Sequence, residues 1–250
     1  MSVEQKSENV IDPPGLIAKQ ILESAEIISG GQLLLGSNST FLVNLDADDG
    51  KIMRAIYKPK IGEKPLHDYP TQTLYRREYA TYLMSRFLGW PNIPITVVRE
   101  GPLGVGTLQS FINFDPNKNY FTLREKRLEE LVVVALFDLV VNNGDRKGGH
   151  FLEDITGKIW SIDHGLTFHK DFKLRTVMFE YCGSSFPKEL IDDIKNLAIQ
   201  LESKDTQHKI LADQISDVEI DALISRLLFI IENPEHPVLD PYIDVPWPLV

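Results

Sequence analysis

Short strand-like runs of apolar residues, bounded by polar and turn-forming ones, recur along the first 113 positions. Predicted strands cover residues 26–35, 40–45, 52–58, 95–99 and 105–112. Turn-forming residues separate them, with an Asp-Gly pair inside 46–50 and glycine-containing turns at 36–39 and 101–104. The pattern therefore predicts an antiparallel meander, with a short helix before it over residues 16–25.

A second helical pattern interrupts the strands of this region, and helical periodicity dominates after it. A helix is predicted over residues 74–88, and Gly89 and Pro91 end it. Further helices are predicted at 123–141, 187–201 and 217–231, the last after a capping box of Ser216 and Glu219. Two short strands are predicted between them, at 151–153 and 159–162.

These elements predict an α+β chain of two lobes that together form one domain. Residues 1–14 are expected to be a flexible arm, 15–113 an N-lobe of sheet plus one main helix, and 114–232 a mostly helical C-lobe. A connector rich in Asn, Asp and Pro lies at 113–120, and the Pro-rich tail 233–250 is expected to be extended. A cleft between the two lobes is expected to hold the site.

Composition limits the class of protein. The formal net charge of −10 argues against nucleic acid as a partner, because a phosphate backbone requires a cationic face. One cysteine, Cys182, can form neither an internal disulfide nor a Cys-rich zinc site. The opening residues lack the features of a signal peptide, and no run approaches the roughly 20 apolar residues of a membrane span. A cytoplasmic protein is therefore expected, and its oligomeric state is not predicted.

Two aspartates carry the candidate chemistry. Asp145 follows the apolar helix at 123–141, and Asp163 ends an apolar strand; each lies close to glycine, which allows sharp turns and close ligand approach. Two such carboxylates suit a site that orients a hydroxyl with one acid and holds Mg²⁺ with the other, as phosphoryl transfer requires. His150 follows Asp145 by five positions and could bind the metal or donate a hydrogen bond that shapes the loop.

The predicted N-lobe supplies groups for phosphate. Lys58 ends the third strand and Glu78 lies on the following helix, an arrangement by which kinases hold a lysine against nucleotide phosphates. Lys60 is the alternative lysine on the same strand face. The turn formed by Gly36, Ser37, Asn38 and Ser39 could present backbone N–H groups to a phosphate.

Taken in order, these segments resemble the small bacterial phosphatidylinositol 3-/4-kinase-like proteins, which are distantly related to lipid kinases and HipA-type kinases. The resemblance covers about residues 26–183. Its motifs are Tyr-Lys-Pro at 57–59, Gly-Glu-Lys-Pro-Leu at 62–66, Arg-Glu-Tyr-Ala at 77–80, Asn-Asn-Gly-Asp-Arg-Lys-Gly-Gly-His at 142–150, Ile-Asp-His-Gly at 162–165, and Leu-Arg-Thr at 174–176.

The resemblance implies a bilobal, protein-kinase-like fold that binds ATP with Mg²⁺ or Mn²⁺. Asp145 would be the catalytic aspartate, Asp163 a metal ligand, and Lys58, held by Glu78, a phosphate contact. The backbone of Gln109, Ser110 and Phe111 would face the adenine. The relatives usually place Asn where this chain has His150, and imidazole suits Mg²⁺ less well than an amide oxygen does.

The predicted function is ATP-dependent phosphotransfer to an unknown hydroxyl on a small molecule or protein. A nucleotide-binding pseudokinase and an AMPylase-like protein nucleotidyltransferase are the alternatives. The lipid-kinase resemblance does not imply a lipid substrate, because no basic amphipathic helix is present to bind an anionic membrane. Arg146, Lys147 and Arg175 could bind a substrate phosphate, although a solvated surface is the more ordinary environment for the charges at 146 and 147.

Overall fold

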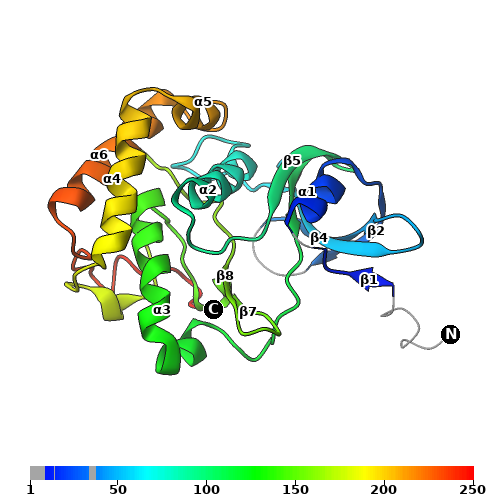
Figure 1. The fold of residues 1–250 in the computed structure, drawn as a ribbon, viewed down its shortest axis with the longest axis horizontal. Coiled ribbons are helices and arrows are strands. Elements are labelled where there is room, and N and C mark those ends of the chain that lie inside the picture. The colour runs from blue at the N-terminus through cyan, green and yellow to red at the C-terminus, as the bar shows by residue number, and fades with distance from the viewer. Residues whose placement is uncertain (1–8, 14, 34–37) are drawn as a thin grey trace. The chain divides into compact units, whose positions relative to one another are not determined.

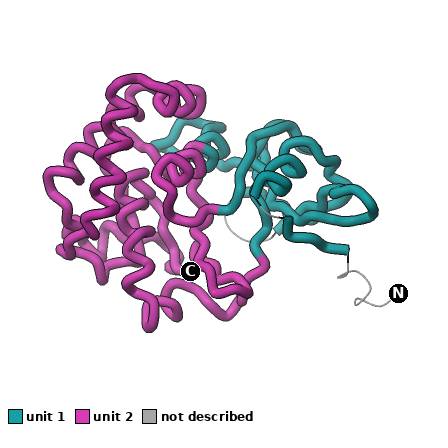
Figure 2. The backbone as a smooth tube through the Cα atoms, in the orientation of Figure 1, with its two compact units in different colours: residues 1–79, 94–112 teal, residues 80–93, 113–250 magenta. Residues whose placement is uncertain are grey.

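The computed structural model describes residues 9–13, 15–33 and 38–250. Its elements divide between two units, one of residues 1–79 and 94–112 and one of residues 80–93 and 113–250 (Figure 2). The division falls inside helix α2 (Leu74–Leu88). The mixed α and β composition predicted from the sequence is confirmed.

Unit 1 is built on a six-stranded sheet (Figure 1). Its strands are β1 (Val10–Ile11), β2 (Ile27–Leu33), β3 (Thr40–Asp46), β4 (Ile52–Pro59), β5 (Thr96–Gly101) and β6 (Gly104–Ser110). The order is β2-β3-β4-β6-β5 with antiparallel neighbours, and β1 pairs in parallel with β4. Strand β1 lies within the segment expected to be a flexible arm.

Strand β4 alternates between buried and partly exposed residues, as a strand with one covered face should. Met53, Ala55 and Tyr57 join the core under helix α1 (Gly15–Ser24), whose Ala18 and Leu22 are buried there. Because side chains alternate along a strand, Lys58 is directed to the face opposite this core. The 3₁₀ turn η2 (Lys60–Gly62) follows, so Lys60 lies beyond the end of the strand.

Unit 2 is mostly helical. Its helices are α3 (Tyr120–Val141), α4 (Lys188–Glu202), α5 (Thr206–Ala212) and α6 (Asp217–Glu232), with β7 (Phe151–Glu153) and β8 (Ile159–Ser161) as an antiparallel pair and 3₁₀ turns η3 (Gly148–His150) and η4 (Phe179–Tyr181). The predicted capping box is confirmed, since the Glu219 carboxylate accepts hydrogen bonds from Ser216 N and Oγ. Helix α5 and the 3₁₀ turns were not predicted.

Helix α3 delivers the chain to the first candidate motif. From Leu131 onwards nearly all of its side chains are buried, including the carboxylate of Asp138. The helix ends at Asn142, which adopts a left-handed conformation with φ 55° and ψ 56°. The chain therefore leaves a rigid, buried helix three residues before Asp145. No helix among the described residues is both long and apolar enough to cross a membrane.

Candidate functional site

In unit 1 the predicted lysine and glutamate form an ion pair. Lys58 Nζ lies 3.0 Å from Glu78 Oε2, and the Glu78 side chain is only 3% exposed. Lys58 remains partly exposed at 23%. A buried carboxylate thus fixes a lysine whose ammonium reaches the surface of the unit, a suitable arrangement for contact with an anionic ligand.

The residues predicted to bind phosphate through a turn have structural contacts here. Asn38 Oδ1 accepts from Lys64 N at 2.8 Å, and Ser39 N donates to Gly62 O at 2.9 Å. Gly36 and Ser37 lie outside the described residues. In the same region Glu63, which the sequence did not single out, accepts hydrogen bonds from Leu74 N and Tyr75 N and so caps α2.

The segment predicted to face adenine lies at the end of β6, which runs between β4 and β5 in the sheet of unit 1. Gln109 is buried, and its amide donates to Thr96 Oγ1 at 2.9 Å. Ser110 N donates to Ile95 O and Phe111 N donates to Arg54 O, whose guanidinium stacks 4.3 Å from the Phe111 ring centroid. These two N–H groups are therefore engaged within the sheet, and the adenine contact stays a prediction.

In unit 2 the Asp145 carboxylate is partly buried and paired with a lysine. Its side chain is 26% exposed, and Lys147 Nζ lies 2.9 Å from Oδ2. Burial raises the pKa of the Asp145 carboxyl above its usual range, the Lys147 ammonium lowers it, and the Asp163 carboxylate raises it again. The two predicted aspartates are therefore close enough in unit 2 to influence each other. Lys147 was expected at a solvated surface and instead lies in the site.

Asp163 has a strained backbone and an exposed side chain. Its φ is 60°, a left-handed conformation uncommon for residues other than glycine. The side chain is 51% exposed, and Oδ2 lies 3.3 Å from His150 Nε2. The fold thus brings His150 into contact with Asp163.

A buried ion pair holds the two aspartate segments together. Arg146 is fully buried and binds Asp138 through two hydrogen bonds, Nε to Oδ2 at 2.6 Å and Nη2 to Oδ1 at 2.8 Å. Arg146 Nη1 also donates to Ile162 O at 3.0 Å, next to Asp163, and Nη2 lies 2.8 Å from His164 Nε2. Arg146 is therefore a structural residue, not a solvated charge. A carboxylate in the otherwise apolar run of α3 was the sequence signal that a buried partner had to exist.

The two asparagines of the motif also have defined structural contacts. Asn142 donates to His169 O and Asp171 O and accepts from Lys173 N, which closes the end of α3. Asn143 Nδ2 donates to Asp138 Oδ1, and its Oδ1 accepts from Asp145 N. These contacts fix the backbone that leads into Asp145.

The Asp163 carboxylate suits a divalent ion only when other ligands complete the coordination. Among the described residues, no three His, Cys, Asp or Glu side chains gather in a way that could hold a metal. Mg²⁺ commonly binds one or two carboxylates and completes its coordination with substrate phosphates and water. The half-exposed Asp163 carboxylate suits that mode, in which the ion arrives with a nucleotide.

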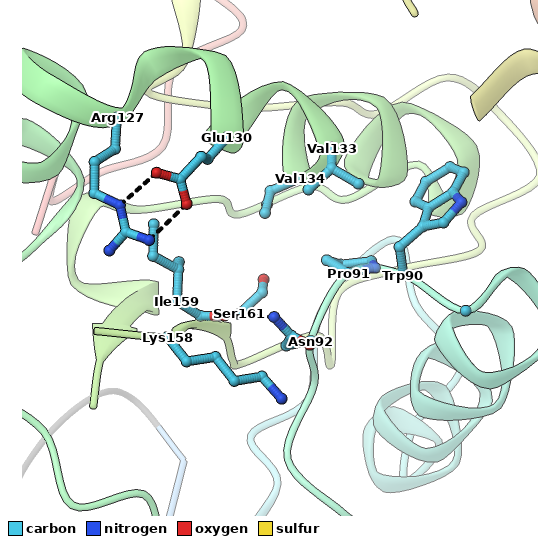
Figure 3. Close-up of a pocket in the computed structure, with 11 residues that line it drawn as sticks. Trp90, Pro91, Asn92, Arg127, Glu130, Val133, Val134, Lys158, Ile159 and Ser161 are labelled. Carbon is cyan, nitrogen blue, oxygen red and sulfur yellow. Dashed lines mark hydrogen bonds and ion pairs between the residues drawn. The ribbon is translucent and has the colours of Figure 1, made fainter. Parts of the chain in front are cut away.

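A pocket of ≈ 210 Å³ also lies within unit 2 but contains none of the predicted site residues (Figure 3). It is lined by Gly89, Trp90, Pro91, Asn92, Arg127, Glu130, Val133, Val134, Lys158, Ile159 and Ser161. Its Arg127 is bound to Glu130, Glu153 and Gly157 O. These contacts already use the Arg127 guanidinium, whereas Lys158 is exposed and its ammonium lies 4.0 Å from the Trp160 ring centroid.

Comparison with solved structures defines the fold as kinase-like. The Golgi casein kinase matches with a TM-score of 0.56 and 15% identity over 89% of this chain and 75% of that chain. The same kinase with Mn and ADP bound gives 0.55 and 14% over 86% and 74%. The hydra Fam20 structure with sugar gives 0.51 and 14% over 92% and 93%. At these identities the likeness concerns the fold alone.

The sequence comparison then supplies a family. Protein Rv2133c of Mycobacterium tuberculosis is 32% identical over 263 residues, which cover 91% of this chain and 94% of that protein. The chain belongs to the same family as Protein Rv2133c. No family model matches it.

Proposed function

We propose that this protein is an ATP-dependent phosphotransferase that uses a divalent metal, related to the phosphatidylinositol 3-/4-kinase-like proteins. The observation that carries the proposal is the pairing of Asp145 and Asp163 in unit 2. One carboxyl is partly buried with a raised pKa, and the other is exposed beside it. Carboxyl groups in such different environments suit different roles in one reaction.

Asp145 orients the acceptor hydroxyl and takes its proton as the oxygen–phosphorus bond forms and ADP leaves. A raised pKa brings this base closer to the pH at which it works, which favours proton transfer. Asp163 would hold the divalent ion, which would supply positive charge to the phosphates when bound. Lys58, fixed by Glu78, is the cation that we propose for phosphate contact within unit 1. The sequence also offered His150 as a metal ligand or as a hydrogen-bond donor that shapes the loop.

Replacing the carboxylates tests these roles. Asp145→Asn should lower phosphate transfer by about 100- to 10,000-fold, the usual contribution of a positioned base. Asp163→Asn should weaken both the metal dependence and the rate. Asp213→Asn, at an exposed position after α5, is the matched control and should leave activity unchanged. Full activity of Asp145→Asn would show that the base is assigned wrongly.

Nucleotide binding can be tested separately from turnover. A nucleotide at about 100 times its Kd stabilises a protein by about 2.7 kcal/mol, and each kcal/mol raises Tm by about 2–4 °C in a chain of this size. ATP with Mg²⁺ or Mn²⁺ should therefore raise Tm by several degrees. If Tm does not move with either metal, the proposed function is wrong.

The alternative of binding without turnover is favoured by one observation, His150 in the position where an oxygen ligand was expected. Incubation with ATP followed by intact-mass measurement of the protein and its acceptors separates the outcomes. A phosphate adduct supports the kinase, an AMP adduct indicates nucleotidyl transfer, and a Tm shift with no adduct and no ATP hydrolysis indicates a pseudokinase.

A further inference from the structure

His150 has a defined hydrogen-bonding arrangement on both ring nitrogens. Its Nδ1 accepts from Lys147 N at 3.4 Å, and its own backbone N donates to Lys147 O at 3.2 Å. A backbone N–H can donate only to a ring nitrogen that carries no proton. Nδ1 is therefore the accepting nitrogen in this arrangement, and Nε2 is the nitrogen left to donate.

This second nitrogen is the one that faces Asp163. Nε2 lies 3.3 Å from Asp163 Oδ2, within reach of a hydrogen bond from a ring N–H to the carboxylate. A metal ligand must offer a lone pair, and the lone pair of this ring is on Nδ1, where it already accepts from the loop backbone.

The backbone around His150 holds Asp163 as well. His150 O accepts from Ile162 N at 3.1 Å, in the residue immediately before Asp163. The His150 side chain is only 12% exposed, whereas that of Asp163 is 51% exposed. The nearly buried His150 ring and the His150 carbonyl thus support Asp163, whose carboxylate is exposed and whose backbone φ is 60°.

We infer that His150 is a positioning residue that orients the Asp163 carboxylate by donating from Nε2, and is not a metal ligand. The inference rests on the proposed function for the role of Asp163. It gives a physical reason for imidazole at this position, because Mg²⁺ prefers oxygen ligands while carboxylate ligands are commonly oriented by hydrogen bonds from neighbouring groups.

Substitution at His150 separates positioning from ligation. His150→Ala should lower kcat by about 10- to 100-fold, the usual effect of losing a group that orients a ligand. His150→Gln can place an amide N–H near the position of Nε2 and should restore most of the rate, whereas the shorter His150→Asn should not. The ratio of Mg²⁺ to Mn²⁺ affinity, measured with ADP present, should be the same in wild type and His150→Ala.

Two spectroscopic measurements on the full-length protein decide the matter. Electron spin-echo envelope modulation of the Mn²⁺–ADP complex should show no directly coordinated histidine nitrogen. In the metal-free protein, ¹⁵N NMR should show the His150 proton on Nε2.

A nitrogen coupling that disappears in His150→Ala, or a shift of that variant's preference towards Mg²⁺, would overturn the inference. So would a proton found on Nδ1, which is observable without any nucleotide. Failure of Mn²⁺ and ADP to bind at all would instead overturn the proposed function and, with it, the role given to Asp163.

Discussion

Replacing Arg146 with methionine should destabilise the protein strongly. The guanidinium is fully buried and makes two short hydrogen bonds to Asp138, which is itself 1% exposed. Methionine retains much of the volume but leaves the Asp138 carboxylate buried without its cation. Breaking a buried ion pair in this way costs about 3–5 kcal/mol. At about 2–4 °C per kcal/mol, Tm should fall by roughly 6–20 °C.

Urea unfolding followed by tryptophan fluorescence gives the free energy directly, and thermal scans give Tm. Arg175→Met is the matched control, because Arg175 is exposed on a neighbouring segment, and it should stay within about 0.5 kcal/mol of wild type. Asp138→Asn combined with Arg146→Met removes the uncompensated charge and should be more stable than Arg146→Met alone. A loss below 1 kcal/mol for Arg146→Met, or strict additivity of the two single changes, would refute the reasoning.

Lys147→Ala should move the acid limb of the kcat/KM pH profile to higher pH, because the Lys147 ammonium lowers the pKa of the Asp145 carboxyl. Lys147→Arg keeps the positive charge and should leave the acid limb in place. An unmoved limb in Lys147→Ala contradicts the ion pair between Lys147 and Asp145. Asp145→Asn should raise Tm at neutral pH. A carboxyl whose pKa is raised on folding stabilises the protein below its unfolded pKa, and this stability is lost as pH rises through the folded pKa. The higher Tm of Asp145→Asn should therefore disappear in acid. Gly148→Ala should cost about 1–3 kcal/mol in urea unfolding, since its Cβ would lie 2.6 Å from Phe121 Cε2, whereas Gly149→Ala meets no atom closer than 3.5 Å and should be nearly neutral.

The elements most reliably predicted from sequence were those with a strong local pattern. The alternation in β4, the Asp-Gly hairpin after β3 and the capping box of α6 each follow from a few adjacent residues. Strand β1 has only two residues and pairs with a strand about 40 positions away, so no local periodicity could show it. Helix α5 has seven residues, too few for the apolar spacing to distinguish a helix from a loop.

Within the candidate site, residue types were easier to predict than their partners. The ion pair between Lys58 and Glu78 followed from a strand and a helix in sequence order, and the structure contains it. The pairing of Arg146 with Asp138 could not be predicted from the sequence, because a buried salt bridge depends on how the helix and the loop pack. The contact of Lys147 with Asp145 could not be predicted either, since a lysine in a polar loop is usually solvated and only the fold directs it to Asp145.

The structural contacts of the 142–146 segment indicate why Asp145 is the residue to which we give the catalytic role. Asn142 closes α3, Asn143 fixes the backbone at Asp145, and Arg146 neutralises Asp138. Each of these side chains provides a hydrogen-bond or ion-pair partner for another group, so a contribution to stability is enough to explain its presence. The Asp145 carboxyl differs, because its raised pKa means that the fold disfavours the charged form. A charge that the surrounding structure fixes in position and yet destabilises is better explained by chemistry than by packing.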